Sequence, residues 1–98
     1  MSGRYILVHG EPQVCEDLHT WALWFEQANY ERIVAQNEIG DVSVSTVFLG
    51  LDHSFGGATP LLFETMIFNG PHDGYQERYA TKAEALEGHA KALALVKP

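Results

Sequence analysis

The hydrophobic positions of the chain follow a helical period first and a period of two afterwards. Apolar residues recur every three or four positions from Glu16 to Ala28, which predicts an amphipathic helix. The apolar stripe of this helix consists of Leu18, Trp21, Ala22 and Phe25, and Trp24 lies outside it. Before the helix, the apolar run Tyr5–Val8 predicts a short strand that ends at the turn residues His9-Gly10 and at Pro12.

From Tyr30 onward, alternating apolar and polar residues predict strands separated by turn residues. The predicted strands are Arg32–Ile39, Val42–Leu51, Leu61–Phe68 and Tyr75–Tyr79. The connections between them are rich in Gly, Asn, Asp and Pro, with a longer loop from His53 to Pro60, so neighbouring strands are expected to pair as antiparallel hairpins. The segment from Asp41 to Phe68 is the most apolar and β-branched part of the chain, and the rest is expected to pack around it.

A second helix is predicted near the C-terminal end of the sequence. Thr81-Lys82-Ala83-Glu84 matches the capping box that opens a helix, and the apolar periodicity continues to about Val96. Gly88 lies inside this helix, where glycine costs roughly 1 kcal/mol relative to alanine. A close approach of another backbone is expected to explain this glycine.

These elements predict one α+β domain over residues 1–98, with an antiparallel meander of four strands and both helices packed on one face. If the turns centre on Gly40-Asp41 and Gly56-Gly57, Ile33 and Phe48 lie on the helix-covered face and Phe48 pairs with Thr65. The opposite face is expected to hold Val34, Leu62, Glu64, Met66 and Phe68 among others. Because that face is too apolar for plain solvent-exposed surface, function is expected there.

Composition narrows the classes of partner. The 98 residues carry 13 acidic and 6 basic side chains, a formal net charge of −7, which argues against nonspecific binding to nucleic acid or anionic membranes. Cys15 is the single cysteine, which excludes an intramolecular disulfide and a cysteine metal cluster. The first eight residues match neither a secretory signal nor a membrane-spanning segment. A cytoplasmic protein is therefore expected.

Few residues are spaced as catalytic or metal sites require. Asp52-His53-Ser54 are adjacent at a strand end, so alternate side chains point apart and cannot form a relay alone. The five histidines lack the short paired spacings of zinc sites, although a composite site from His53, His72 and Asp73 stays open. Ser54-Phe55-Gly56-Gly57 precedes a strand rather than a helix, which excludes a phosphate loop. Neither a metal nor a cofactor is expected.

Glu64 is the most informative single position, because its own face of the strand also carries the apolar residues Leu62 and Met66. Burial of its carboxylate requires a partner. Either a structural pair with Arg32 or with Tyr79, or a polar anchor for a ligand or second subunit, explains it. The binding site is predicted around Trp24, Arg32, His53 and Glu64, where Arg32 supplies a cation and Trp24 a flat face for stacking.

Several phrases resemble a family of small proteins encoded by bacteriophages and their prophages. The phrases are VSTVFLGLDHSFGG, PLLFETMIF, RYATKAEALEGHA and TWALWFEQA, and the similarity covers nearly the whole chain. No functional residue can be carried over, because no activity is established for the family. The resemblance implies an accessory protein in the cytoplasm of a bacterial host, a setting in which small proteins often block a defence complex or sequester a nucleotide immune signal.

Three hypotheses follow. The first is a non-enzymatic binding protein for a host protein or a small nucleotide-like ligand, with counter-defence as its role. The second is a small enzyme that uses His53 and Glu64, and the third is a self-associating structural or virion-related protein. A homo-oligomer, most simply a dimer, is expected to cover part of the mixed face. The lack of a compact catalytic constellation favours the first hypothesis over the second.

Overall fold

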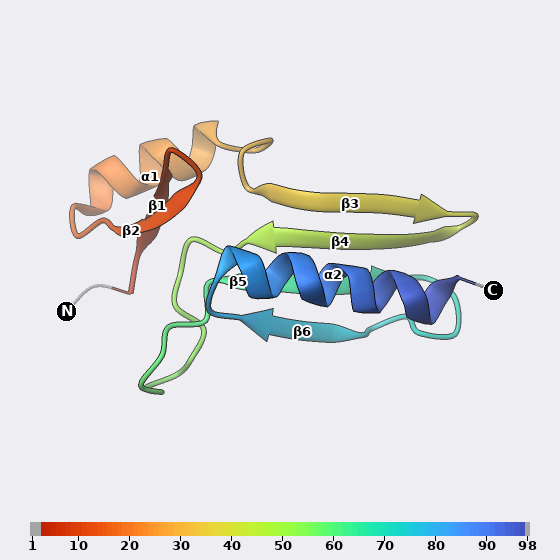
Figure 1. The fold of residues 1–98 in the computed structure, drawn as a ribbon. Coiled ribbons are helices and arrows are strands. Elements are labelled where there is room, and N and C mark those ends of the chain that lie inside the picture. The colour runs from red at the N-terminus through yellow and green to blue at the C-terminus, as the bar shows by residue number, and fades with distance from the viewer. Residues whose placement is uncertain (1–2, 98) are drawn as a thin grey trace.

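The computed structural model describes residues 3–97, whose helices and strands form two parts (Figure 1). The N-terminal part contains a two-stranded sheet of β1 (Tyr5–Val8) and β2 (Glu11–Val14), followed by α1 (Leu18–Gln27). The sheet–α2 part contains β3 (Ile33–Ile39), β4 (Val42–Phe48), β5 (Phe63–Phe68), β6 (Gln76–Tyr79) and α2 (Lys82–Val96). The chain extends over 45 × 29 × 20 Å, with the two parts arranged along its length.

The four long strands form an antiparallel meander in the order β3-β4-β5-β6, which confirms the predicted α+β fold class. Helix α2 crosses one face of this sheet and contacts all four strands (Figure 1). Both helices were expected on that face, whereas α1 packs against β1 beyond the end of the sheet. Helix α1 reaches the sheet through Trp24, whose ring meets Phe48 edge-on at a centroid distance of 5.8 Å. Neither helix of the described residues is long and apolar enough to cross a membrane.

The strand β2 was not predicted, because Pro12 was expected to end the preceding strand. His9 and Gly10 have φ angles of 52° and 81°, and two such residues make the tight turn that joins β1 to β2. Pro12 then pairs with Leu7. Proline is tolerated there because β2 is an edge strand, whose outward-facing backbone groups need no N–H donor.

The second hairpin pairs two residues away from its predicted register. Phe48 lies opposite Phe63 rather than Thr65, and Val47 lies opposite Glu64. In the middle of the connection Phe55 and Gly56 are left-handed, with φ angles of 54° and 93°, so the chain reverses one residue before the predicted Gly56-Gly57. Because the shift is an even number of residues, every β4 and β5 side chain keeps its predicted face.

A bulge in β3 corrects the predicted faces of two residues. Ile33 pairs with Val47 and Ala35 with Thr46, which leaves Val34 as an extra residue. As a result Val34 packs against the core cluster under α2, and Ile33 is turned to the open face with 39% of its surface exposed. The prediction had these two side chains the other way round.

The core lies between the sheet and α2. One buried cluster contains Phe48, Leu62, Phe63 and Ala85, so Leu62 belongs to the core rather than to the open face. A second cluster contains Val44, Ile67 and Ala92. The alanines on α2 are small, which lets the helix approach the sheet closely.

The start of α2 confirms the predicted capping box. The Thr81 hydroxyl accepts a hydrogen bond from the Glu84 backbone N–H at 3.1 Å, and the Glu84 carboxylate accepts from the Thr81 backbone N–H at 3.1 Å. Gly88 is required by a side chain rather than by another backbone. The ring and hydroxyl of Tyr79 lie against it, and a Cβ at this position would overlap them.

Helix α1 faces the rest of the chain with a different stripe from the predicted one. Trp21, Trp24 and Phe25 are half-buried, whereas Leu18 is 59% exposed and Ala22 is exposed. The indole N–H of Trp21 donates to the backbone carbonyls of Tyr5 at 3.1 Å and Gly50 at 3.0 Å. The aromatic side chains turn inward and contact the ends of the neighbouring strands, since Trp21 reaches Tyr5 and Trp24 reaches Phe48. Leu18 points away from them and stays exposed.

Candidate functional site

Two of the four predicted site residues, Trp24 and Arg32, meet at Phe48. The Arg32 Nε–H donates to the Phe48 carbonyl at 3.3 Å, and the guanidinium lies 4.1 Å from the centroid of the Phe25 ring. Partial burial lowers the pKa of Arg32, and no carboxylate within residues 3–97 forms an ion pair with it. Both side chains therefore support the junction of α1 with the sheet, and the uncompensated charge of Arg32 stays available to an anion.

Glu64 lies on the open face of the sheet in a satisfied pair. Its carboxylate accepts hydrogen bonds from Arg78 Nε–H at 2.9 Å and from the Gln76 amide at 2.5 Å, and the residue is 9% exposed. Of the two explanations given for Glu64, the structural arginine pair is present, with Arg78 rather than Arg32. Tyr79 pairs with Phe63 on the other face, so its phenol cannot serve.

His53 and its neighbours brace the loop between β4 and β5. The Asp52 carboxylate accepts hydrogen bonds from the backbone N–H groups of Ser54 at 2.8 Å and Leu61 at 3.0 Å, and these bonds lower the pKa of Asp52. The Nδ1 of His53 is 2.9 Å from the Leu51 carbonyl, which makes Nδ1 the protonated nitrogen. Asp52, His53 and Ser54 thus stabilise the loop. They form no catalytic relay by themselves, as their adjacent positions in the sequence indicated.

The composite metal site is not assembled. No group of three His, Cys, Asp or Glu side chains in residues 3–97 lies close enough to hold a metal ion. Asp73 instead accepts a hydrogen bond from the Asn69 backbone N–H at 2.6 Å. Within the same residues, no hydrogen bond, ion pair or ring contact joins His53 or Glu64 to Trp24 or Arg32.

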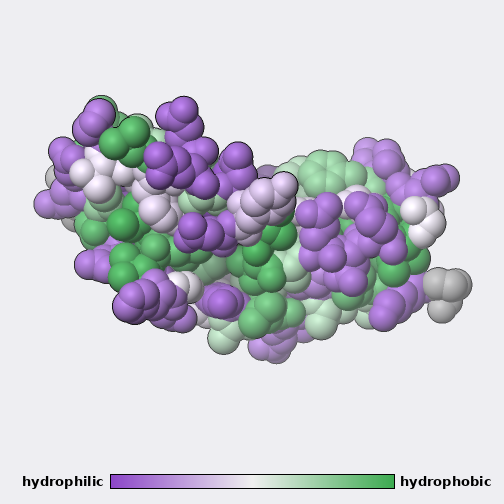
Figure 2. All heavy atoms as spheres, turned by 90° about the horizontal axis from the view of Figure 1, so that it is seen from above, coloured by the Kyte–Doolittle hydropathy of each residue, from purple (hydrophilic) through white to green (hydrophobic). Residues whose placement is uncertain are grey.

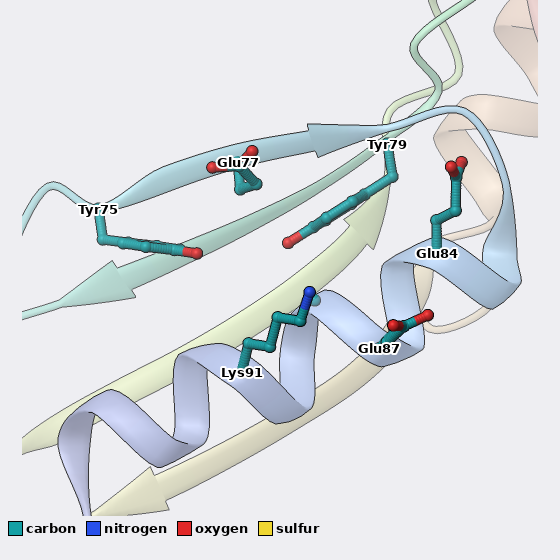
Figure 3. Close-up of a pocket in the computed structure, with 7 residues that line it drawn as sticks. Tyr75, Glu77, Tyr79, Glu84, Glu87 and Lys91 are labelled. Atoms are coloured by element: carbon teal, nitrogen blue, oxygen red, sulfur yellow. The ribbon is translucent and has the colours of Figure 1, made fainter.

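A groove of about 450 Å³ runs between β6 and α2 (Figure 3), and it was not foreseen from the sequence. We call it the β6–α2 groove. It is lined by Tyr75, Glu77, Tyr79, Glu84, Glu87, Gly88 and Lys91. Figure 3 shows the side chains of Tyr75, directly before β6, and of Tyr79, in β6, extending above α2 with the charged side chains around them.

Alternation places Tyr75, Glu77 and Tyr79 on one face of β6, and helical spacing places Glu84, Glu87 and Lys91 on one side of α2. These spacings are visible in the sequence. The sequence does not show that the two sets of side chains face each other, because this depends on how α2 lies across the sheet.

Most charged side chains of the groove form no hydrogen bond or ion pair with the described residues. Glu84 is held by the capping box, but Glu77, Glu87 and Lys91 are exposed and make no hydrogen bond or ion pair with the described residues. Tyr79 is half-buried, and burial is the largest cause that raises its pKa, with the nearby Thr65 hydroxyl opposing the rise. The Tyr79 hydroxyl nevertheless makes no hydrogen bond of good geometry among these residues.

A second hollow, of about 420 Å³, lies between the N-terminal part and the loop after β4. Its walls include Tyr5, Val14, Glu16, Asp52 and Pro60. The Asp52 carboxylate there already accepts two backbone hydrogen bonds. The β6–α2 groove therefore offers more uncommitted charge to a partner.

A buried polar chain lies behind the groove, between the sheet and α2. His89 Nδ1 is 2.7 Å from the Thr46 hydroxyl, which is 2.5 Å from the Thr65 hydroxyl, and His89 Nε2 is 2.8 Å from Asn37 Oδ1. With Asn37 so oriented, Nε2 carries the proton and Nδ1 accepts from Thr46. Burial lowers the pKa of His89, which favours this neutral form.

Comparison with models of protein families, with curated proteins and with solved structures found no match to the chain. The resemblance to small phage proteins therefore stays an expectation, and the candidate site is argued from geometry and charge.

Proposed function

We propose that the protein acts by non-enzymatic binding and that the β6–α2 groove is its binding site. The observation that carries this proposal is a groove of about 450 Å³ whose walls combine two tyrosine rings with three charged groups, Glu77, Glu87 and Lys91, that have no bonded partner among residues 3–97. Concave sites with aromatic walls and a few convergent polar groups are typical of ligand and partner recognition. Structural side chains such as Glu64 and Asp52, in contrast, are already bonded.

The charge of the groove favours a host protein over a nucleotide signal as the partner. Three carboxylates, those of Glu77, Glu84 and Glu87, face one ammonium, that of Lys91. Like charges at an interface disfavour binding, so a polyanionic nucleotide is a poor ligand here. In the phage setting that the resemblance implies, the proposal is a counter-defence protein that blocks a host defence protein. Sequestration of a nucleotide at Arg32 and Trp24 stays the alternative.

The test is native mass spectrometry of the protein purified from phage-infected cells, which reports retained protein or small-molecule mass together. We expect a retained protein that is lost from the Glu87→Lys variant and kept by Glu26→Lys. Both glutamates are exposed on helices, and neither has a bonded partner among the described residues. Retention of a nucleotide, lost in Arg32→Ala and kept in Glu87→Lys, would overturn the assignment of the groove.

Self-association is a second candidate, favoured by the sheet face opposite α2. No helix or strand of residues 3–97 covers this open face, where Ile33 and Phe68 are 39% and 44% exposed beside the half-buried Val47 and Met66. Figure 2 looks down on α1 and the β3 edge of the sheet, where hydrophobic side chains lie between polar ones, and it views the open face only from the side. Glu64 and Arg78 neutralise each other at the centre of the face, so two copies can stack without repulsion there.

The size of the open face sets the strength expected of a dimer. Four strands about 4.8 Å apart, with roughly seven residues of about 3.3 Å each, span roughly 20 × 20 Å. Such an area is small for a specific interface, so a weak dimer is expected. Sedimentation velocity is the measurement. Phe68→Glu should give monomer where wild type and the exposed control Leu23→Glu give dimer, and a monomeric wild type across the micromolar range contradicts the dimer.

A further inference from the structure

The nature of the partner follows from three features of the β6–α2 groove, and the argument rests on the binding function proposed above. The first feature is charge. Glu77 lies on the strand side and Glu87 on the helix side, both exposed and unpaired, so a ligand in the groove lies between two free carboxylates (Figure 3). A cation placed there gains from both, and an anion is opposed by both.

The second feature is the aromatic wall. Tyr75 and Tyr79 are half-buried, and their side chains extend from β6 toward each other over α2 (Figure 3). The face of an aromatic ring attracts an ammonium or guanidinium group, and a flat ring also packs against the aliphatic part of a lysine or arginine side chain. Gly88 keeps this wall in place, because any larger residue would displace the Tyr79 ring.

The third feature is Lys91, the cation that the chain itself supplies. Its side chain rises from α2 toward the Tyr79 side chain (Figure 3), yet it forms no ion pair with Glu87 one turn earlier. The ammonium thus stands in the groove without being bonded there. A basic side chain from outside has to displace it.

The outer edge of β6 adds a way to hold such a side chain. Strand β6 is the last strand of the sheet, so its outer edge has no strand partner among the described residues. An extended segment that pairs with a sheet edge gains main-chain hydrogen bonds, and alternate side chains fall on one face of the sheet. On β6 that face is the one that Tyr75, Glu77 and Tyr79 share with the groove.

We propose that the β6–α2 groove recognises an extended basic segment of a partner protein, which adds to the edge of β6 and places a lysine or arginine between Glu77, Glu87 and the two tyrosines. Lys91 is an internal competitor that occupies the groove when the segment is absent. Binding is therefore weakened by the loss of either carboxylate and strengthened by the loss of the Lys91 charge.

The experiment uses two blocked peptides, acetyl-Val-Arg-Val-Arg-Val-amide and its counterpart with glutamate in place of arginine. Binding to the full chain is measured at low salt by isothermal titration calorimetry, and the shifts of the Gly88 and Glu77 amides by NMR. We expect the arginine peptide to bind and the glutamate peptide not to bind. Glu77→Gln together with Glu87→Gln should weaken the arginine peptide about tenfold, and Lys91→Gln should strengthen it about threefold. Glu26→Gln and Lys97→Gln, which lie outside the groove, should leave the affinity unchanged.

Weaker binding by Lys91→Gln, or equal binding of the two peptides, would overturn the proposal. The wild-type fold of each variant is checked by its far-UV circular dichroism. If the peptides do not bind while a host protein is still retained from infected cells and lost in Glu87→Lys, the binding function stands and the basic-segment assignment fails. If neither is seen, both fail.

Discussion

The two parts of the molecule differ in how much side chain they bury. In the sheet–α2 part, Val44, Phe48, Phe63 and Ile67 have no exposed surface. In the N-terminal part no residue of β1, β2 or α1 is buried, and the buried residues of that region, Cys15 and Ala28, lie outside these elements. One part is therefore stabilised by a hydrophobic core and the other by its attachment to that core.

The attachment consists of a few specific contacts. The Trp21 indole bridges β1 and Gly50, Trp24 meets Phe48, and the Cβ-free Gly50 admits the Phe25 ring. Few buried apolar contacts mean a low local free energy of opening, so the N-terminal part is expected to open before the sheet unfolds. Both proposed interaction surfaces, the β6–α2 groove and the open face, belong to the more stable part.

The largest effect is expected from a change in the core of the sheet–α2 part. Phe63→Ala should lower the free energy of unfolding by about 3–5 kcal/mol, because it leaves a cavity next to Phe48. The matched change in the N-terminal part, Leu23→Ala, should stay within about 0.5 kcal/mol of wild type because Leu23 is 46% exposed. Urea denaturation midpoints compare the two, and equal losses would show that α1 has a core of its own.

A smaller and more local effect is expected from Trp21→Phe. This change removes the indole N–H that donates to the carbonyls of Tyr5 and Gly50, and each such bond contributes about 0.5–1.5 kcal/mol. Native-state hydrogen exchange should become faster in β1 and α1 while the amides of β4 and β5 keep their rates. Equal acceleration in all four elements would mean that the two parts unfold as one unit.

The smallest effect is the pH dependence of stability. It differs between the two parts because each contains a different group whose pKa is shifted on folding. Burial lowers the pKa of His89 below its ordinary value of 6.5, so the neutral form stabilises the fold above that pH. This stabilisation is lost as the pH falls below 6.5, and the loss ends once the pH is below the folded-state pKa. Thermal melting of wild type should fall between pH 7.5 and 5, whereas His89→Gln should show less of this fall and the exposed His72→Gln should keep it.

In the N-terminal part the corresponding group is Asp17, the N-cap of α1. Hydrogen bonds from the Thr20 hydroxyl and backbone N–H lower its pKa below 3.8. Its contribution is present above pH 3.8 and is lost as the pH falls through the folded-state pKa. Mild acid should therefore weaken the sheet–α2 part first, and exchange rates in α1 that rise between pH 6.5 and 5 would contradict this order.

Local chemistry along the chain determined the elements and their order. The capping box at Thr81 and Glu84, the turn at Gly40-Asp41 and the alternation of the β-branched strands are short-range signals, because neighbours in the sequence produce them. They predicted the four-stranded meander, α2 and the α+β class correctly. They also predicted Glu64 to need a partner, since a buried carboxylate in an apolar strand requires one wherever the strand lies.

Features that depend on contacts between distant parts of the chain were decided by the tertiary structure alone. The bulge at Val34 and the turn at Phe55-Gly56 set which residues pair. No residue pattern marks the bulge, and Gly57 made the turn one residue later equally plausible. The inward face of α1 depends on which strand ends it meets. The β6–α2 groove and the His89–Thr46–Thr65 chain arise where α2 crosses the sheet, since they bring together residues up to 43 positions apart. Alternation and helical spacing place each side chain on its own element, but only packing brings two elements face to face.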